Sequence, residues 1–324
     1  MIRFHRLALA AAFLCAGPAF SQTLKFAHFV APTHTLTEAV ITPLIKETEA
    51  SGLKIEVYAA GKLGAGPSDQ YMRVLQGVAD IAWGLQGYTS AQFPLSMLPE
   101  WPLAKPAQMS GADFLWNGYE AGLLAKEYPA TTPLALWTAE DAVLITRSTP
   151  VRRPQDMAGM KIRVSSAISA KAVTALGASP VQMPAGDVYN ALQTGLIDGV
   201  VIGASGITDF KYDEVLGHVT TGIPLGNQSF FVVASTASLK RLPEAQSEAL
   251  AKASGRALSN HAEEMWNARA KAALEALREK SGVVIDLEPA EVAAFDALLR
   301  PLLAQGLAQL GGEATLRTFQ GGQP

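Results

Sequence analysis

The sequence is poor in cysteine and in charged residues. Its 324 residues include one cysteine and five histidines, and 17% are charged, with 26 Lys+Arg against 29 Asp+Glu. A single cysteine excludes a disulfide framework and a cysteine-based zinc site. A net charge of −3 provides no general attraction for nucleic acid, so no nucleic-acid partner is expected. The hydrophobic content of 49% is that of an ordinary folded protein and excludes a disordered chain.

The first 21 residues have the three parts of a secretory signal peptide. Arg3 and Arg6 precede an apolar run, and small residues lie before a predicted cut between Ser21 and Gln22. Cys15 lies inside that run, so the remaining chain has no cysteine and a net charge of −5. No later stretch has the 18 or so consecutive apolar residues that a membrane-spanning helix needs. We therefore expect an exported protein that is located in the periplasm.

Strands and helices alternate along the rest of the chain. Residues 24–30 and 53–58 alternate with period two, and 78–83 form a third apolar strand, with helices expected between them. This β-α-β-α-β order predicts a parallel sheet with helical crossovers. A second set of strands is expected at 142–147, 161–164, 180–183 and 199–202. The segment from Glu244 to about Lys280 has the composition of helix.

Two such halves predict an α/β protein with two lobes and a ligand cleft between them. The cleft is expected where the carboxyl ends of the strands meet. We expect lobe I to contain residues 22–143 plus about 229–270. Lobe II is expected to contain residues 144–228 plus about 271–324.

Motifs for catalysis are scarce. The histidines lack metal-ligand spacing, so neither a metal nor a cofactor is expected. Ser205 lies in a near match to the Gly-x-Ser-x-Gly elbow of hydrolases, but the spacing is wrong. Ser51 and Lys54 satisfy Ser-x-x-Lys without an evident partner motif. We do not expect an enzyme, and a periplasmic α/β hydrolase that uses one of these serines is the alternative.

The segment 147–203 has the most specific pattern in the chain. It contains Pro-Gln-Asp-Met-x-Gly-Met-Lys-Ile-Arg-Val at 154–164, Leu-Gly-Ala-Ser-Pro at 176–180 and Asp-Val-Tyr-x-Ala-Leu-Gln-Thr-Gly-x-Ile-Asp-Gly at 187–199. This order and spacing resemble the solute-binding proteins of TRAP transporters, the DctP-type family. Flanking stretches extend the resemblance over essentially the whole chain after the signal peptide.

The resemblance implies the two-lobed fold of periplasmic binding proteins, with a hinge and a ligand cleft between the lobes. It also implies a binding site for an organic acid. In that family the arginine that ends Gly-x-Lys-x-Arg pairs with a carboxylate of the ligand, and here this arginine is Arg163. A guanidinium suits the task because it offers two parallel donors and stays charged. Arg147 matches an arginine that lies beside the same pocket in some branches. The resemblance also implies a monomeric receptor that delivers its ligand to membrane permease subunits, with a sensor for a signalling receptor as the alternative.

Other candidates for the pocket lie in loops that follow strands. They are Phe29, His34, Gln86, Tyr88, Met183 and Asn227. Many family members have Gln-Glu-Asn-Pro after the Asp-Gly, and the asparagine helps to bind the ligand. This chain has Val200-Val201-Ile202-Gly203 instead, which makes that wall of the pocket apolar. A keto acid or an aromatic acid is therefore expected beside a C4-dicarboxylate, the usual ligand of the family.

Overall fold

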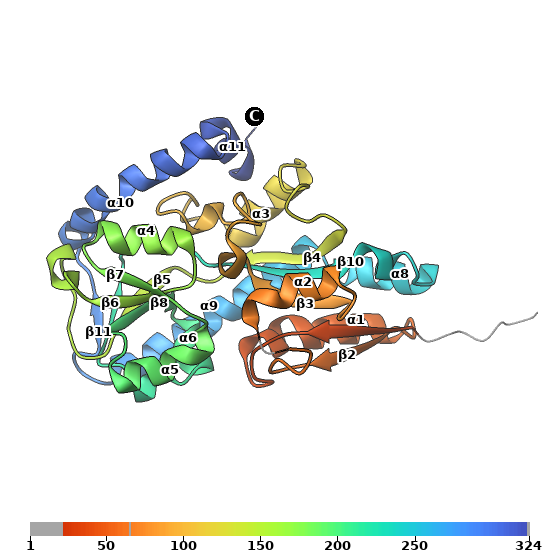
Figure 1. The fold of residues 1–324 in the computed structure, drawn as a ribbon, viewed down its shortest axis with the longest axis horizontal. Helices are drawn as coiled ribbons and strands as arrows, with labels where there is room; N and C mark the ends of the chain where they lie inside the picture. Colours follow the sequence, from red (N-terminus) through yellow and green to blue (C-terminus); the bar gives the residue numbers. More distant parts are fainter. Residues whose placement is uncertain (1–21, 65, 323–324) are drawn as a thin grey trace, which may run out of the picture.

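Two β-sheets form the centre of the protein in the computed structural model, which describes residues 22–64 and 66–322 (Figure 1). The predicted signal peptide lies outside the described residues. The strands of the first sheet are β1 (Thr23–Ala27), β2 (Lys54–Tyr58), β3 (Ile81–Leu85), β4 (Thr131–Thr138) and β10 (Ser229–Ser235). Those of the second are β5 (Ala142–Thr146), β6 (Lys161–Val164), β7 (Ser179–Gln182), β8 (Gly199–Gly203), β9 (His218–Thr221) and β11 (Val284–Asp286).

Helices and helical turns cover both sheets. Those around the first sheet are η1 (Thr37–Ile41), α1 (Thr42–Glu49), η2 (Pro67–Asp69), α2 (Gln70–Leu75), η3 (Gln86–Thr89), η4 (Leu98–Glu100), α3 (Gly111–Glu120), α7 (Thr236–Leu239) and α8 (Glu244–Lys252). Those around the second are η5 (Pro154–Met157), α4 (Ala167–Ala175), α5 (Ala185–Thr194), α6 (Ser205–Asp209) and η6 (Tyr212–Glu214). The remaining three are α9 (Arg256–Arg278), α10 (Pro289–Gln309) and α11 (Gly312–Phe319). No helix in the described part of the chain is long and apolar enough to cross a membrane.

The first sheet has the strand order β2-β1-β3-β10-β4. The parallel pairing of β1 with β2 and β3 is confirmed. The sheet is nevertheless mixed, because β10 lies antiparallel between β3 and β4. The sequence did not reveal β4, since Pro133 is untypical of a strand. Pro133 is tolerated because β4 is an edge strand and the pairing with β10 shifts register beside it.

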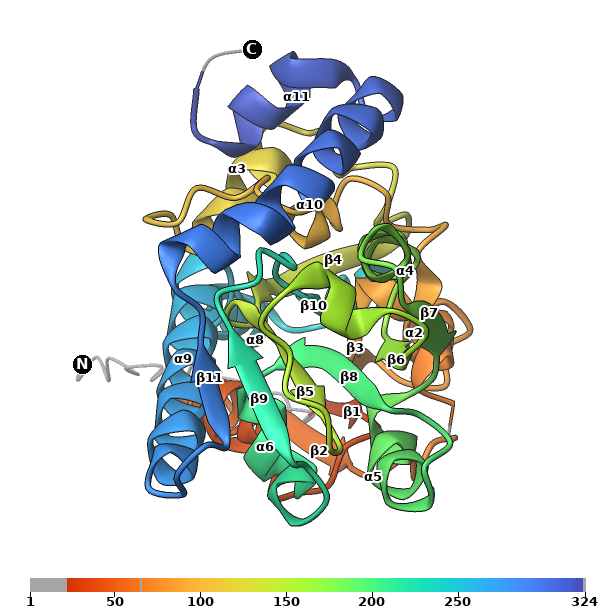
Figure 2. The ribbon, with the colours of Figure 1, turned by 90° about the vertical axis from the view of Figure 1, so that its left-hand side faces the viewer.

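The second sheet has the order β11-β9-β5-β8-β6-β7, seen in Figure 2. All four strands expected there are present, and β6 pairs in parallel with β7 and β8. The expected helical segment from Glu244 to Lys280 is two helices, α8 and α9. It is interrupted at Gly255, whose φ of 83° favours glycine.

Alternation of side chains along the central strands builds a core on each face of both sheets. In β10, Phe230 and Val232 pack with α9, while Phe231 and Val233 pack with α2 and α3 on the other face. In β5, Leu144 packs in the core on one face of the second sheet, and Ile145 packs in the core on the other face. Strands that are buried on both faces read as continuous apolar runs, as these do.

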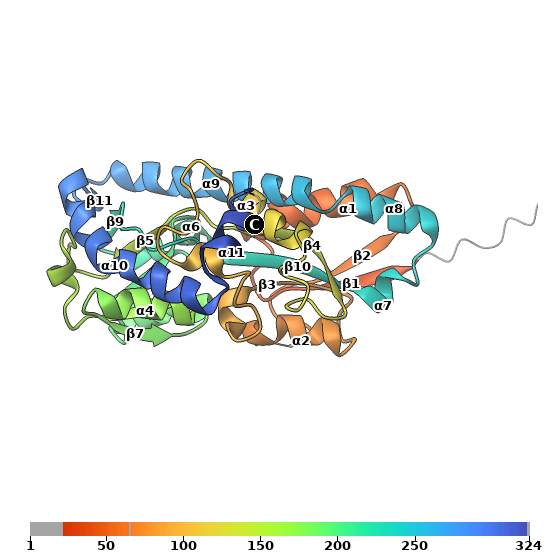
Figure 3. The ribbon, with the colours of Figure 1, turned by 90° about the horizontal axis from the view of Figure 1, so that it is seen from above.

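Each sheet with its helices forms one lobe, so the expected two-lobed α/β fold is confirmed. The crossing segments 139–142 and 226–228 lie side by side, with hydrogen bonds of 2.8 Å from Ala139 N to Gln228 O and 3.2 Å from Ala142 N to Gly226 O. Helix α9 runs along both lobes (Figure 3). Helix α10 begins over the second sheet, and α11 ends against α3. The residue ranges expected for each lobe stay a prediction.

Candidate functional site: a cavity between the lobes

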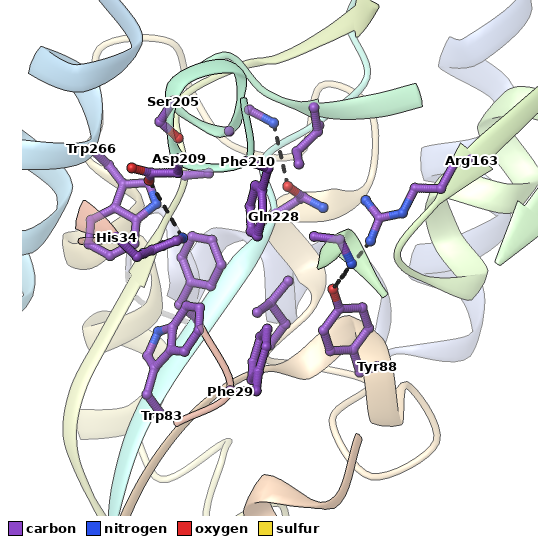
Figure 4. A pocket seen from close by; sticks show the side chains of 17 residues that line it. Phe29, His34, Trp83, Tyr88, Arg163, Ser205, Asp209, Phe210, Gln228 and Trp266 are labelled. Atoms are coloured by element: carbon purple, nitrogen blue, oxygen red, sulfur yellow. Dashed lines mark hydrogen bonds and ion pairs between the residues drawn. The ribbon is translucent and has the colours of Figure 1, made fainter. Parts of the chain in front are cut away.

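Side chains from both lobes line a cavity between the two sheets (Figure 4). The first lobe contributes Phe29, His34, Trp83, Leu85, Tyr88 and Phe230. The second lobe contributes Arg163, Ala185, Ile202, Gly203, Ser205, Gly206, Asp209 and Phe210. A crossing segment and α9 add Ala139, Gln228 and Trp266. The lining is therefore largely aromatic and apolar, with a few polar groups placed within it.

Arg163 is fully buried at the cavity. Its Nε donates to the carbonyl oxygen of Met183 at 2.8 Å, and its Nη2 donates to the hydroxyl of Tyr88 at 3.2 Å. Within the described part of the chain, Nη1 has no hydrogen-bond partner and no carboxylate pairs with the guanidinium. Burying a charge without a counter-charge is costly. Nη1 is therefore able to donate to an anion in the cavity.

The hydroxyl of Tyr88 joins the two lobes at this point. Tyr88 lies in η3, directly after β3, and its oxygen accepts from Ala185 N at 3.0 Å as well as from Arg163. A phenolic oxygen has two lone pairs and one proton. Because both hydrogen bonds use the lone pairs, the proton is left to donate to an acceptor in the cavity.

Aromatic rings form the walls beside this polar end. Phe29 stacks on Trp83 with centroids 4.9 Å apart at 20°, and its edge contacts Tyr88 at 5.9 Å. The ring centroid of Phe230 lies 5.6 Å from the ring centroids of both Trp83 and Trp266. Flat, apolar walls of this kind favour a ligand with a planar or compact apolar body.

The far end of the cavity holds His34 and Asp209. Burial lowers the pKa of His34 to about 4; the charge of Asp209 acts in the opposite direction, and that of Arg269 adds to the lowering. The Nδ1 atom accepts from Leu36 N at 3.1 Å, so Nε2 holds the proton of the neutral ring and lies 3.5 Å from Asp209 Oδ2. Both ring nitrogens are engaged, and His34 therefore has no nitrogen free to act as a base for Ser205.

The structure brings four of the eight predicted site residues together in the cavity: Phe29, His34, Tyr88 and Arg163. The other four do not line it. Met183 contributes its carbonyl oxygen to Arg163, and Gln86 is buried and donates to the hydroxyl of Tyr128 at 3.2 Å.

Asn227 and Arg147 lie outside the cavity. The amide of Asn227 donates to Ala139 O at 3.2 Å and to Asp141 Oδ1 at 2.9 Å, where the chain crosses between the lobes. Arg147 is exposed at the end of β5, beside Gly195.

Several lining residues were not expected from the sequence. They are Trp83, Asp209, Phe210, Phe230 and Trp266. Ile202 does line the cavity, so the apolar Val-Val-Ile-Gly segment contributes to its wall. Among the described residues no group of three or more histidines, cysteines or acids is placed to hold a metal ion.

Two α/β lobes around a cavity with a buried, unpaired guanidinium define a solute-binding protein. The chain belongs to the DctP family, described as bacterial extracellular solute-binding protein, family 7, whose sequence model matches residues 26–309. The resemblance stated from the motifs at 154–199 is thereby confirmed. Members of this family are solute-binding proteins and not enzymes.

Known relatives agree with this assignment. The C4-dicarboxylate-binding periplasmic protein DctP of Rhodobacter capsulatus is 26% identical over 310 residues, covering 91% of this chain and 90% of that protein. A TRAP solute-binding protein of Rhodoferax ferrireducens, solved with copurified benzoate, has a TM-score of 0.85 and 24% identity, covering 93% and 97% of the two chains. A relative from Bordetella bronchiseptica with bound mandelate has a TM-score of 0.83 and 24% identity, covering 93% and 98%.

Proposed function

We propose that the protein is a periplasmic receptor for an organic carboxylate with a flat apolar body, such as an aromatic acid. It delivers this ligand to the membrane permease subunits of a TRAP-type transporter. One observation carries the proposal: the guanidinium of Arg163 is buried at an aromatic cavity, and its Nη1 lacks any partner among the described residues.

The ligand carboxylate is held by donors from both lobes. One oxygen accepts from Arg163 Nη1, and the Tyr88 hydroxyl supplies the proton that its own hydrogen bonds leave free. Charge-assisted hydrogen bonds of this kind are strong, and closure removes them from water. The ligand stabilises the closed form because only there do both donors reach it.

The aromatic class of ligand is supported by the walls of the cavity. Phe29, Trp83 and Phe230 offer ring faces and edges, and Ile202 stands where many family members have a polar asparagine. The relatives with bound benzoate and mandelate hold acids of this class. Burying an aromatic ring against an apolar wall stabilises the complex. The same wall offers no hydrogen bonds to the hydroxyl groups of a sugar acid.

A thermal-shift screen of organic acids tests the proposal. A ligand at about 100 times its Kd stabilises the protein by about 2.7 kcal/mol, which raises Tm by a few degrees. We expect this shift with benzoate or a related acid, and its loss in Arg163→Met. The matched control is Arg153→Met, since Arg153 is an exposed arginine of the same lobe and pairs with Asp156. Absence of a shift with every carboxylate contradicts the proposal.

The alternatives predict different results. A hydrolase that uses Ser205, or Ser51 with Lys54, releases product from a bound ester. Loss of that product in Ser205→Ala or in Ser51→Ala establishes the hydrolase. A sensor binds the same acid, but uptake of the labelled acid then continues in cells that lack the permease subunits. Loss of uptake in those cells supports transport.

A further inference from the structure

The cavity has opposite charges at its two ends. In the described part of the chain, Arg163 is the only lysine or arginine in its lining, and Asp209 is the only acid. Figure 4 shows the two side chains on opposite sides of the cavity. A ligand whose carboxylate contacts Arg163 therefore directs its other end toward Asp209.

Asp209 lines the cavity, and its carboxylate is held in place by groups of the protein. Thr35 donates to it through N at 3.3 Å and through Oγ1 at 2.7 Å, and the Asp209 side chain is 1% exposed. His34 is neutral at pH 7, because burial keeps its pKa at about 4. Hydrogen bonds from neutral donors position the carboxylate and do not cancel its charge.

Among the described residues, Arg269 is the one lysine or arginine that pairs with Asp209. Its Nε lies 3.4 Å from Asp209 Oδ1. Its side chain is 38% exposed, and it does not line the cavity. Water screens a charge at such a position far more than one inside the cavity. We therefore expect an anion in the cavity to interact more strongly with Asp209, which lines it, than with Arg269, which does not.

A second acid lies behind this end of the cavity. Ser205 N donates to Glu140 Oε1 at 2.6 Å, and Glu140 Oε2 is buried without a partner among the described residues. Burial raises the pKa of Glu140 to about 7, and the charge of Asp209 adds to this. The carboxyl group of Glu140 thus resists ionisation mainly because it is buried, and the charge of Asp209 adds to that resistance. A carboxylate brought by a ligand meets the same field.

We propose that the ligand carries a single carboxylate, and that Asp209 rejects acids with a second anionic group at the far end. This inference rests on the proposed function, because it takes Arg163 as the partner of the first carboxylate. It separates this chain from receptors of C4-dicarboxylates, which need positive or donor groups at both ends of the cavity. Asp209 is then a residue that determines specificity.

Pairs of ligands that differ only in charge test the inference. Terephthalate is compared with its monoamide, and succinate with succinamate, by isothermal titration calorimetry of the whole protein at pH 7.5. We expect the monoamide of at least one pair to bind about tenfold tighter than its diacid, because like charges that are brought close together repel each other. In Asp209→Asn we expect this ratio to fall to about threefold or less.

Two further variants keep the test independent of folding defects in Asp209→Asn. Glu140→Gln removes the neighbouring acid and is expected to lower the same ratio in part. Asp213→Asn makes the same chemical change at an exposed position of η6 and is expected to leave the ratio unaltered.

The results separate the two proposals. Diacids that bind as tightly as their monoamides, with binding lost in Arg163→Met, overturn the inference and leave the proposed function standing. Monoamides rejected as strongly as diacids overturn it too, because size and not charge then sets the selection. If the protein binds neither these acids nor benzoate, the proposed function itself fails.

Discussion

The hydroxyl of Tyr88 lies 3.2 Å from Nη2 of Arg163, although the two side chains belong to different lobes. The same oxygen accepts from Ala185 N at 3.0 Å. One hydroxyl group therefore connects the lobes beside the atom that is proposed to receive the ligand carboxylate. Under the proposed function, closure and ligand binding use the same few atoms, so each is expected to stabilise the other.

Tyr88→Phe is expected to weaken ligand binding by about tenfold, because a hydrogen bond to a charged group contributes about 1.5–3 kcal/mol. The loss is expected mainly in the dissociation rate, since the closed form loses its contact between lobes. Titration calorimetry with stopped-flow dissociation of benzoate measures both quantities. Tyr189→Phe is the control, because the Tyr189 hydroxyl donates to Glu214 on the surface of the second lobe, away from the cavity lining. Equal affinities for Tyr88→Phe and the unaltered protein contradict the assigned role.

Ile202→Asn tests the apolar wall. Ile202 is 5% exposed and lines the cavity, so an asparagine there places a polar group in the wall that is proposed to cover the ring of an aromatic acid. We expect the affinity for benzoate to fall relative to that for glucuronate, with a loss of stability of about 1–3 kcal/mol from the buried amide. Ile202→Leu keeps the wall apolar, costs less than about 1.5 kcal/mol and is expected to keep the preference. A preference for benzoate that survives unchanged in Ile202→Asn shows that Ile202 does not determine the selection of an aromatic acid.

Glu100 gives a test that depends on pH. Its side chain is buried, and burial raises its pKa from 4.5 to about 7 against the hydrogen bonds from Ser166 and from Ser229 N. Between pH 4.5 and about 7, Glu100 therefore stays protonated in the folded protein, whereas it is ionised in the unfolded chain. Its contribution to stability is therefore complete below pH 4.5 and is lost as the pH rises to about 7 and beyond.

Glu100→Gln removes this dependence. Relative to the unaltered protein, the variant is expected to gain up to about 3 kcal/mol between pH 4.5 and pH 8, because each unit of pKa shift corresponds to about 1.4 kcal/mol. Denaturant titrations at a series of pH values measure the difference. Glu248→Gln, at an exposed position of α8, is the control. A difference between variant and parent that does not change with pH shows that Glu100 ionises normally.

Gly306→Ala tests the packing of α10 on the first lobe. A β-carbon at Gly306 lies 2.7 Å from ring atoms of Trp101, which is too close for the ring to stay in place. We expect a loss of about 1–3 kcal/mol from overpacking, although alanine ordinarily stabilises a helix by about 1 kcal/mol over glycine. Gly186→Ala in α5 is the control: no described atom lies within 4 Å of its β-carbon, so the variant is expected to gain stability. Chemical denaturation of both variants distinguishes packing from helix propensity.

The sequence predicted the elements whose signals are local. Strands β1, β2 and β3 alternate or are strongly apolar, and the end of α5 is marked by Gly195 with its φ of 73°. Strand β4 was not expected, because Pro133 is acceptable only through an edge position and a register shift that depend on β10. A parallel sheet was expected, and the insertion of β10 makes it mixed, which no local pattern can show.

The site was predictable where a motif marked it. Arg163 was found through its motif, and Phe29, His34 and Tyr88 through their positions after strands. Trp83, Phe230 and Trp266 could not be found in this way. Each lies in a segment whose pattern fits a buried strand or helix, and only the tertiary structure brings the three together at the cavity.

The position of β10 also determines the order in which the lobes can be completed. Ser229–Ser235 supply the strand between β3 and β4. The first sheet therefore lacks its connecting strand until residue 235 has been made. Five of the six strands of the second sheet lie together in the chain, between β4 and β10. Contacts between distant segments slow folding, since a long loop must close before they form. The first sheet therefore begins first along the chain but receives its last strand only after five of the six strands of the second sheet have been made.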